Sequence, residues 1–174
     1  MKIFLVGFMG SGKTTIGKRL AEPIGYDFVD TDNLIEIQSD MAVSDIFANH
    51  GEVAFRNMER DVLLELQKRD YTVVSTGGGM PCFNNNMDMM LTNGKVVYLK
   101  TSPQALARRL QYSHTERPLI KEKSQEELQH YITEKLAERE IHYSRAHIVV
   151  QTETFSMDEL LQSLRLMKQK TSSK

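Results

Sequence analysis

A glycine-rich segment near the start of the chain constrains the fold more than any other feature. Residues 3–6 form the apolar run IFLV, residues 7–14 read GFMGSGKT, and a helix-forming run follows. This strand–loop–helix context and the G-x-x-x-x-G-K-T spacing predict a phosphate-binding loop, or P-loop, whose backbone amides face an anion. Lys13 would add positive charge beside the β- and γ-phosphates of a nucleotide, and Thr14 would offer a hydroxyl to Mg²⁺. A chance glycine-rich turn is the alternative.

The composition excludes several classes of function. Hydrophobic residues make up 40% of the 174 residues and charged residues 26%, so we expect one globular domain. A net charge of −1 attracts neither nucleic acid nor an anionic membrane, and no apolar run approaches the ~20 residues of a membrane span. The single cysteine, Cys82, excludes an intrachain disulfide and favours the cytoplasm; we expect its thiol to be a bystander. The histidines show no metal-ligand spacing, and the N-terminus lacks the pattern of a signal peptide.

Short apolar runs alternate with helical patterns along the chain. The runs predict five strands, at residues 2–6, 27–29, 71–75, 95–100 and 146–150. Because helices separate them, we expect parallel pairing through right-handed crossovers, and therefore a three-layer α/β domain. In such a sheet, ligands collect at the carboxyl ends of the strands.

The helical patterns have recognisable starts and stops. Ser44, Ser102, Ser124 and Ser156 are expected to cap helices, and Gly51 to end a short one. The longest pattern runs from residue 52 to residue 69. Residues 83–93 predict an irregular start and a short helix with its methionines packed inward. The expected helices cover residues 15–21, 31–38, 45–48, 52–69, 103–110, 125 to about 141, and a segment after 156.

Two carboxylates follow the second predicted strand, in Asp30-Thr31-Asp32. At this edge of the sheet one could hold Mg²⁺ through water, and the other could accept a hydrogen bond from a substrate hydroxyl. Capping of the next helix is the alternative, since Asp30 or Thr31 suits an N-cap and Asp32 suits the first turn.

Three glycines, Gly77, Gly78 and Gly79, follow the third predicted strand. A helix cap needs only one glycine, so the triplet favours backbone that a ligand approaches closely; a wide turn is the alternative. The strand before it, residues 71–75, lacks the acid that usually holds the metal in P-loop enzymes, which shifts this role to Asp30.

Three arginines are candidate anion ligands. Arg56 could bind a substrate or pair with Glu52 or Glu59 at helical spacing. Arg139 continues the apolar stripe of its helix, so it needs either a structural acid or an anionic substrate as partner. Arg117 lies in a polar stretch beside a proline. It could be a solvated loop side chain, or it could belong to a lid that closes over a nucleotide.

Together these segments resemble the shikimate kinase family. The resemblance extends from the P-loop to about residue 141. It includes Asp30-Thr31-Asp32, the segment from Gly51-Glu52 through Phe55-Arg56 to Glu59, the acid-free strand with its glycine triplet, Arg117-Pro118-Leu119, and Arg139. It implies an ATP-dependent kinase that phosphorylates the 3-hydroxyl of shikimate, with a P-loop kinase fold, a helical substrate-binding segment at about residues 31–60 and a mobile lid at about 112–122.

The resemblance also implies a role for each site residue. Gly10, Ser11, Gly12, Lys13, Thr14 and Thr15 would bind the phosphates of ATP, with Arg117 reaching over them. Thr14 would bind one Mg²⁺ directly and Asp30 through water. Asp32, Arg56, Gly78 and Arg139 would bind shikimate. Lys13, Asp32 and Arg117 would act in catalysis, with Asp32 a weak candidate for the base.

Two rival functions remain at this point. Another small P-loop kinase, for gluconate or a nucleoside monophosphate, would share the loop, but the acid pair, the triplet and the two arginines argue against it. A nucleotide-hydrolysing switch would need a metal-binding acid after a strand, which residues 71–75 lack. We expect ATP and shikimate as partners, no nucleic acid, no membrane, and a monomer.

Overall fold

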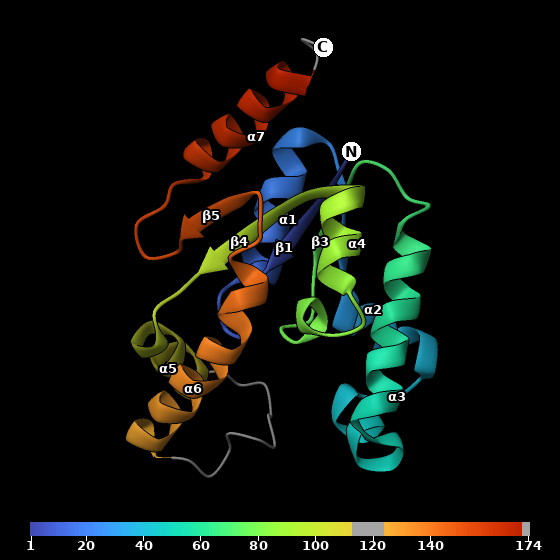
Figure 1. Ribbon diagram of the computed structural model, residues 1–174, viewed down its shortest axis with the longest axis vertical. Helices are drawn as coiled ribbons and strands as arrows, with labels where there is room; N and C mark the ends of the chain where they lie inside the picture. Colours follow the sequence, from blue (N-terminus) through green and yellow to red (C-terminus); the bar gives the residue numbers. More distant parts are fainter. Residues whose placement is uncertain (113–123, 172–174) are drawn as a thin grey trace.

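A five-stranded parallel sheet forms the centre of the protein. Figure 1 shows the computed structural model, which describes residues 1–112 and 124–171. The strands are β1 (Lys2–Val6), β2 (Asp27–Asp30), β3 (Thr72–Ser75), β4 (Gly94–Lys100) and β5 (Ile148–Gln151). Their order is β2-β3-β1-β4-β5, with every neighbouring pair parallel. The predicted α/β class and parallel sheet are confirmed.

Helices connect the strands, as the alternating pattern predicts. They are α1 (Lys13–Ile24), α2 (Thr31–Ser39), α3 (Val43–Leu66), the 3-10 turn η1 (Met80–Cys82), α4 (Asn86–Asn93), α5 (Pro103–Gln111), α6 (Gln125–Tyr143) and α7 (Met157–Thr171). Within residues 1–112 and 124–171, none of the helices combines the length and apolar character that crossing a membrane requires.

Both faces of the sheet are buried, because the strands are apolar on both sides. On one face Phe4 and Val6 of β1 pack against residues of α3, α4 and the end of α6. On the other face Ile3 and Leu5 pack against residues of α1 and α7. The protein therefore has the predicted three layers, with the sheet in the middle (Figure 1).

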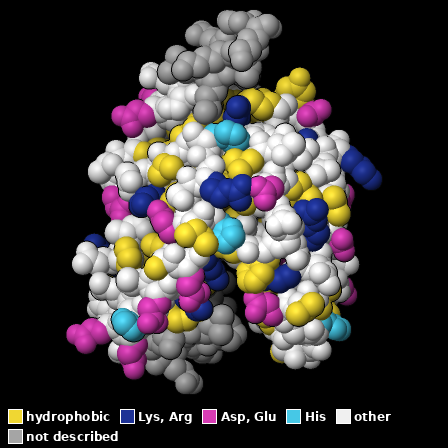
Figure 2. Space-filling model, viewed as in Figure 1, with side chains coloured by type: hydrophobic (Ala, Val, Ile, Leu, Met, Phe, Trp, Pro, Cys, Tyr) yellow, Lys and Arg dark blue, Asp and Glu magenta, His cyan; other side chains and the backbone are white. Residues whose placement is uncertain are grey.

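Two helical arms extend past the carboxyl ends of the strands. In Figure 1, α2 and α3 lie at the lower right, and α5 and α6 at the lower left. The α5–α6 arm has its own apolar cluster, which includes Leu106, Leu110, Leu128 and Ile132 and packs against Phe8 of the P-loop. Figure 2 shows this end of the molecule hollowed between the two arms.

Some helix starts differ from the predictions. Gly51 interrupts the helical geometry (φ 78°, ψ 174°), but the two predicted helices join across it as a kinked α3. The prediction that Ser44 caps the first of them is wrong. Ala42 is the N-cap and forms no side-chain cap hydrogen bond, and the Val43 N–H instead donates to Glu36 Oε1 of α2 at 3.0 Å. Ser102, Ser124 and Ser156 cap their helices as predicted.

The last strand begins two residues later than predicted, at Ile148. The N–H of Val96 on β4 donates to Nδ1 of His147 at 3.0 Å. This bond to a side chain takes the place of the backbone hydrogen bond that the Val96 N–H would form with a longer β5. In contrast, the methionine-rich segment follows its prediction, since Met87 and Met90 are buried on α4.

Candidate active site

The P-loop joins β1 to α1 and is closed by its own lysine. Gly7, Gly10 and Gly12 have φ values of 146°, 81° and 94°, which side-chain-bearing residues rarely adopt. A Cβ on Gly7 would also lie 2.8 Å from the Leu99 carbonyl oxygen of β4. Lys13 Nζ donates to the carbonyl oxygens of Gly7 and Phe8, each at 2.9 Å. The loop thus surrounds a cation at the N-terminus of α1.

An arginine on α5 contacts the same loop. Arg109 Nη1 donates to the carbonyl oxygens of Gly10 and Ser11, at 3.3 and 3.4 Å. The sequence offered no signal for this contact, because it joins residues about a hundred positions apart. Beside it, Ser11 Oγ is buried and has no hydrogen-bond partner among the described residues.

Thr14 and Asp30 meet at the ends of α1 and β2. Thr14 Oγ1 donates to Asp30 Oδ2 at 2.8 Å. The other oxygen, Oδ1, accepts from the Asp32 N–H at 3.2 Å and caps α2. One oxygen of Asp30 therefore caps α2, as the alternative interpretation predicted, and the other accepts a hydrogen bond from the residue that follows Lys13. A hydroxyl and a carboxylate oxygen fit Mg²⁺, which takes few protein ligands and keeps waters and phosphates.

The half-buried Asp32 and the buried Glu59 form a pair of acids beside the glycine triplet. A Cβ on Gly77 would lie 2.6 Å from Asp32 Oδ1 and 2.8 Å from Glu59 Oε1. Among the described residues neither of these two oxygens has a hydrogen-bond partner. Two unpartnered acceptors at a carboxyl end of the sheet can receive hydroxyl groups of a polyol, because a buried acceptor gains from any donor that reaches it.

Burial raises the pKa of both acids. The pKa of Asp32 rises from 3.8 to about 6, mainly through desolvation and then through the charge of Asp30. The pKa of Glu59 rises from 4.5 to about 7, again mainly through desolvation, although the Arg56 cation opposes the rise. Asp32 is therefore largely ionised at neutral pH and still basic enough to accept a proton.

The guanidinium of Arg56 is held from several sides. Nε and Nη2 donate to Glu52 Oε1 at 3.2 and 2.8 Å, and Nη1 donates to Glu59 Oε2 at 2.8 Å. Its Cζ lies 4.1 Å from the ring centroid of Phe83. A Cβ on Gly79 would come within 2.6 Å of Nη1 and 2.8 Å of Nη2, so Gly79 leaves the space that Arg56 fills. The acid pairs weighed as an alternative for Arg56 are present, and they fix its position.

Arg139 projects from the last turns of α6 toward the P-loop. Its Cζ lies 5.2 Å from the ring centroid of Phe8, and Nη1 is 3.6 Å from where a Cβ on Gly78 would stand. No acid among the described residues forms an ion pair with it. Of the two partners predicted for Arg139, a structural acid or an anionic substrate, the acid is therefore absent from residues 1–112 and 124–171.

The structure brings most of the predicted site residues to one end of the sheet. The P-loop and Thr14 lie at the start of α1, Asp30 and Asp32 at the start of α2, and the triplet after β3. Arg56 comes from the α2–α3 arm and Arg139 from the α5–α6 arm. Arg117 lies outside the described residues.

Sequence reasoning did not include Glu59 among the candidate site residues. It lies on the apolar stripe of α3 with Phe55, Val62 and Leu66, and its side chain is 1% exposed. The same reasoning that singled out Arg139 could have found it, since an acid on a buried helical stripe needs a donor.

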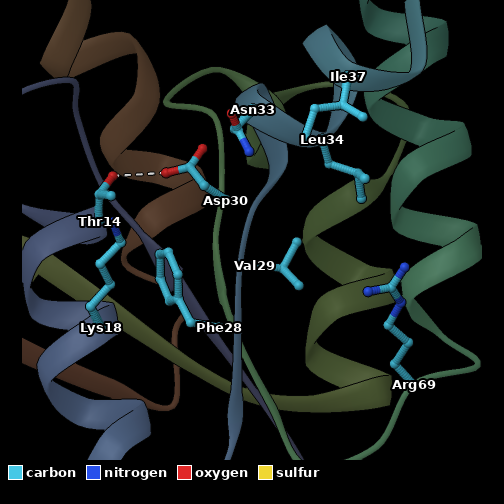
Figure 3. Close-up of a pocket in the computed structure, with 9 residues that line it drawn as sticks. All are labelled: Thr14, Lys18, Phe28, Val29, Asp30, Asn33, Leu34, Ile37 and Arg69. Atoms are coloured by element: carbon cyan, nitrogen blue, oxygen red, sulfur yellow. Dashed lines mark hydrogen bonds between the residues drawn. The ribbon is translucent and has the colours of Figure 1, made fainter.

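A cavity of about 480 Å³ lies beside this site, along the outer edge of β2. Figure 3 shows Lys18 and Phe28 on one side of it, Leu34 and Ile37 of α2 on the other, and the Thr14–Asp30 hydrogen bond at its rim. The lining residues are Thr14, Lys18, Phe28, Val29, Asp30, Asn33, Leu34, Ile37 and Arg69. Asp32, Arg56, Gly78 and Arg139 do not line it.

Comparison with known proteins finds one family along nearly the whole chain. The family described as shikimate kinase matches residues 9–167. A shikimate kinase of Parabacteroides distasonis is 47% identical over 160 residues, which cover 92% of this chain and 90% of that protein. A shikimate kinase of Azobacteroides pseudotrichonymphae is 44% identical over 164 residues, covering 94% of this chain and 96% of that protein.

Solved structures give the same result. A shikimate kinase from Bacteroides thetaiotaomicron superposes with a TM-score of 0.89 at 35% identity, covering 97% of this chain and 98% of that one. A shikimate kinase from Acinetobacter baumannii, solved in complex with shikimate, gives a TM-score of 0.83 at 34% identity, with coverage of 99% and 95%. A gluconokinase from Sinorhizobium meliloti, at 18% identity and a TM-score of 0.56 over 99% and 97% of the two chains, shares the fold alone.

Proposed function

This chain belongs to the shikimate kinase family, and from that premise we propose how its residues divide the work of phosphorylating shikimate. The enzyme transfers the γ-phosphoryl group of ATP to the 3-hydroxyl of shikimate and releases shikimate 3-phosphate and ADP. The reaction belongs to the biosynthesis of chorismate and the aromatic amino acids. The placement of two arginines and two buried acids opposite the P-loop supports the division that follows.

Arg56 and Arg139 bind the carboxylate of shikimate, one from each helical arm. Both guanidinium groups approach the glycine triplet, Arg56 at Gly79 and Arg139 at Gly78. A planar carboxylate can accept hydrogen bonds from two such groups, which fixes the ring as well as its charge. Gly78 lies against the substrate through its backbone.

Asp32 binds hydroxyl groups of shikimate at the opposite end of the molecule from the carboxylate. Its free Oδ1 is buried, and the partner acid Glu59 leaves a second free oxygen beside it. With a pKa of about 6, Asp32 can accept the proton of the attacking hydroxyl. Phosphoryl transfer has a loose transition state and depends mostly on position and charge, so the base contributes less than the binding.

Residues 10–15, which are Gly10, Ser11, Gly12, Lys13, Thr14 and Thr15, bind the phosphates of ATP. Lys13 turns from the carbonyl oxygens of its own loop to the β- and γ-phosphates. Thr14 and Asp30 would hold one Mg²⁺, which would offset negative charge on the phosphates. Arg117, outside the described residues, adds charge from the lid.

The remaining parts of the proposal concern the whole molecule. Residues 1–174 form a single domain, with the substrate-binding segment at about 31–60 and the lid at about 112–122. The enzyme acts as a cytoplasmic monomer, in agreement with its single cysteine and balanced charge. It requires no partner besides ATP, Mg²⁺ and shikimate.

A coupled assay of ADP release tests the residue roles. With shikimate, gluconate or a nucleoside monophosphate as acceptor, shikimate should give by far the highest kcat/KM. Arg139→Ala should raise the KM for shikimate at least ~10-fold, since a charge-assisted bond is lost, and should leave the KM for ATP within about twofold. Glu134→Ala, which removes a charge from the exposed side of the same helix, is the matched control. A variant that loses ATP affinity and keeps shikimate affinity would refute the assignment of Arg139.

A further inference from the structure

Glycine backbone has wide conformational freedom, so the orientation of the peptide planes in the glycine triplet depends on hydrogen bonds with other residues. Hydrogen bonds from outside fix three of its polar groups. The Gly77 N–H donates to Thr31 Oγ1 at 2.9 Å, and the Gly77 carbonyl accepts from the Met80 N–H at 3.1 Å. The Gly79 carbonyl accepts from the Cys82 N–H at 2.9 Å. The peptide between Gly78 and Gly79 still needs a tether.

Tyr143 supplies that tether from the end of α6. Its hydroxyl donates to the Gly78 carbonyl oxygen at 2.5 Å, across 65 residues of sequence. The side chain is fully buried, and its ring lies 5.1 Å from that of Tyr98 on β4. Burial raises the pKa of the Tyr143 hydroxyl, so it remains protonated and able to donate at any physiological pH.

The orientation of this peptide decides where one backbone donor points. In a trans peptide the C=O of Gly78 and the N–H of Gly79 point in opposite directions. Among the described residues, the N–H groups of Gly78 and Gly79 have no hydrogen-bond acceptor. They lie where Arg139 and Arg56 approach the triplet. An anion bound by these arginines is therefore the natural acceptor for both amides.

The last turn of α6 is also fixed to the sheet. Glu140, between Arg139 and Tyr143, accepts from the Tyr98 hydroxyl and from Lys100 Nζ, each at 2.6 Å. Since Arg139 and Tyr143 are four residues apart, they lie on one face of the helix. The same turn thus brings a guanidinium and a phenol hydroxyl close to Gly78.

We propose that Tyr143 is a positioning residue for the shikimate carboxylate. By holding the Gly78 carbonyl, its hydroxyl directs the Gly79 N–H toward the carboxylate that Arg56 and Arg139 bind. The inference rests on the proposed roles of those two arginines. It gives Tyr143 a function in substrate recognition that packing in the core would not require.

Tyr143→Phe removes the hydroxyl and keeps the ring. The KM for shikimate should rise about 10-fold, as expected for one lost hydrogen bond, while kcat and the KM for ATP change less than about twofold. The effect should vanish with the analogue in which the carboxylate of shikimate is replaced by a hydroxymethyl group, because that analogue lacks the acceptor. Tyr71→Phe, which removes the hydroxyl of an exposed ring at the other end of β3 from the triplet, is the matched control and should leave the KM for shikimate unchanged.

Three results would overturn the proposal. They are an unchanged KM in Tyr143→Phe, an equal rise in Tyr71→Phe, and a loss of ATP affinity or of cooperative melting in Tyr143→Phe, which would show that the hydroxyl supports folding in general. If the wild-type enzyme used the hydroxymethyl analogue as well as shikimate, this would show instead that the enzyme does not recognise the carboxylate. That outcome would refute the arginine roles, and it differs from a failure confined to Tyr143.

Discussion

Asp32 lowers the stability of the ligand-free fold, and replacing it with Asn measures how much. Because its pKa rises from 3.8 to about 6 on folding, the folded state binds a proton more tightly than the unfolded state. The free energy of unfolding therefore falls as the pH rises from about 4 to about 6, and stays lowered above that range. At pH 8 the loss is about 3 kcal/mol, since one pKa unit corresponds to about 1.4 kcal/mol.

Asp32→Asn keeps the shape of the side chain and removes the charge. Urea denaturation without ligands should show a gain in unfolding free energy of about 3 kcal/mol at pH 8 and about 1.5 kcal/mol at pH 5. The same variant should lose most of its turnover with shikimate, because the acceptor for the reacting hydroxyl loses its charge. The enzyme would thus become more stable as it becomes less active.

The control is Asp27→Asn, an exposed acid at the start of the preceding strand β2, which should leave the unfolding free energy at pH 8 unchanged. A gain in Asp32→Asn that is equal at pH 5 and pH 8 would show that its cause is not ionisation. No gain at pH 8 would show that the Asp32 carboxylate is stabilised in the ligand-free enzyme by contacts that outweigh its burial. Either result would refute the reasoning.

Two further substitutions test the phosphate end and the carboxylate end separately. Lys13→Ala should lower kcat by a factor on the order of 10²–10³, as for other preorganised charges, and near-normal turnover would remove Lys13 from the mechanism. Gly79→Ala has an allowed backbone (φ −87°), but its methyl group would meet the Arg56 guanidinium at 2.6 Å. It should therefore melt almost normally and raise the KM for shikimate about 10-fold, as for a lost hydrogen bond; an unchanged KM would contradict the placement of Arg56.

Much of the site could be predicted because parallel topology is restrictive. Once five strands run in one direction, the residues that follow them must meet at one edge, and this placed Asp30, Asp32 and the triplet together. Arg139 could be found because a charge on a buried helical stripe needs a partner. The P-loop spacing located the phosphate end from eight residues.

Contacts between distant segments could not be predicted in this way. The order of the strands, the Phe83 ring beside Arg56 and the Tyr143 bond to Gly78 depend on how whole elements pack, and no local pattern encodes them. The helix start at Val43 shows the same limit, because a carboxylate from α2 replaced the expected serine cap.

The fixed position of Arg56 has a consequence for the thermodynamics of association. A free arginine side chain loses about 0.5–1.5 kcal/mol of conformational entropy when a ligand immobilises it. Here Glu52, Glu59 and the Phe83 ring have already immobilised the guanidinium in the ligand-free enzyme. Shikimate bound as proposed would meet a guanidinium that is already ordered, and the cost of ordering Arg56 would belong to the free energy of folding instead of the free energy of binding.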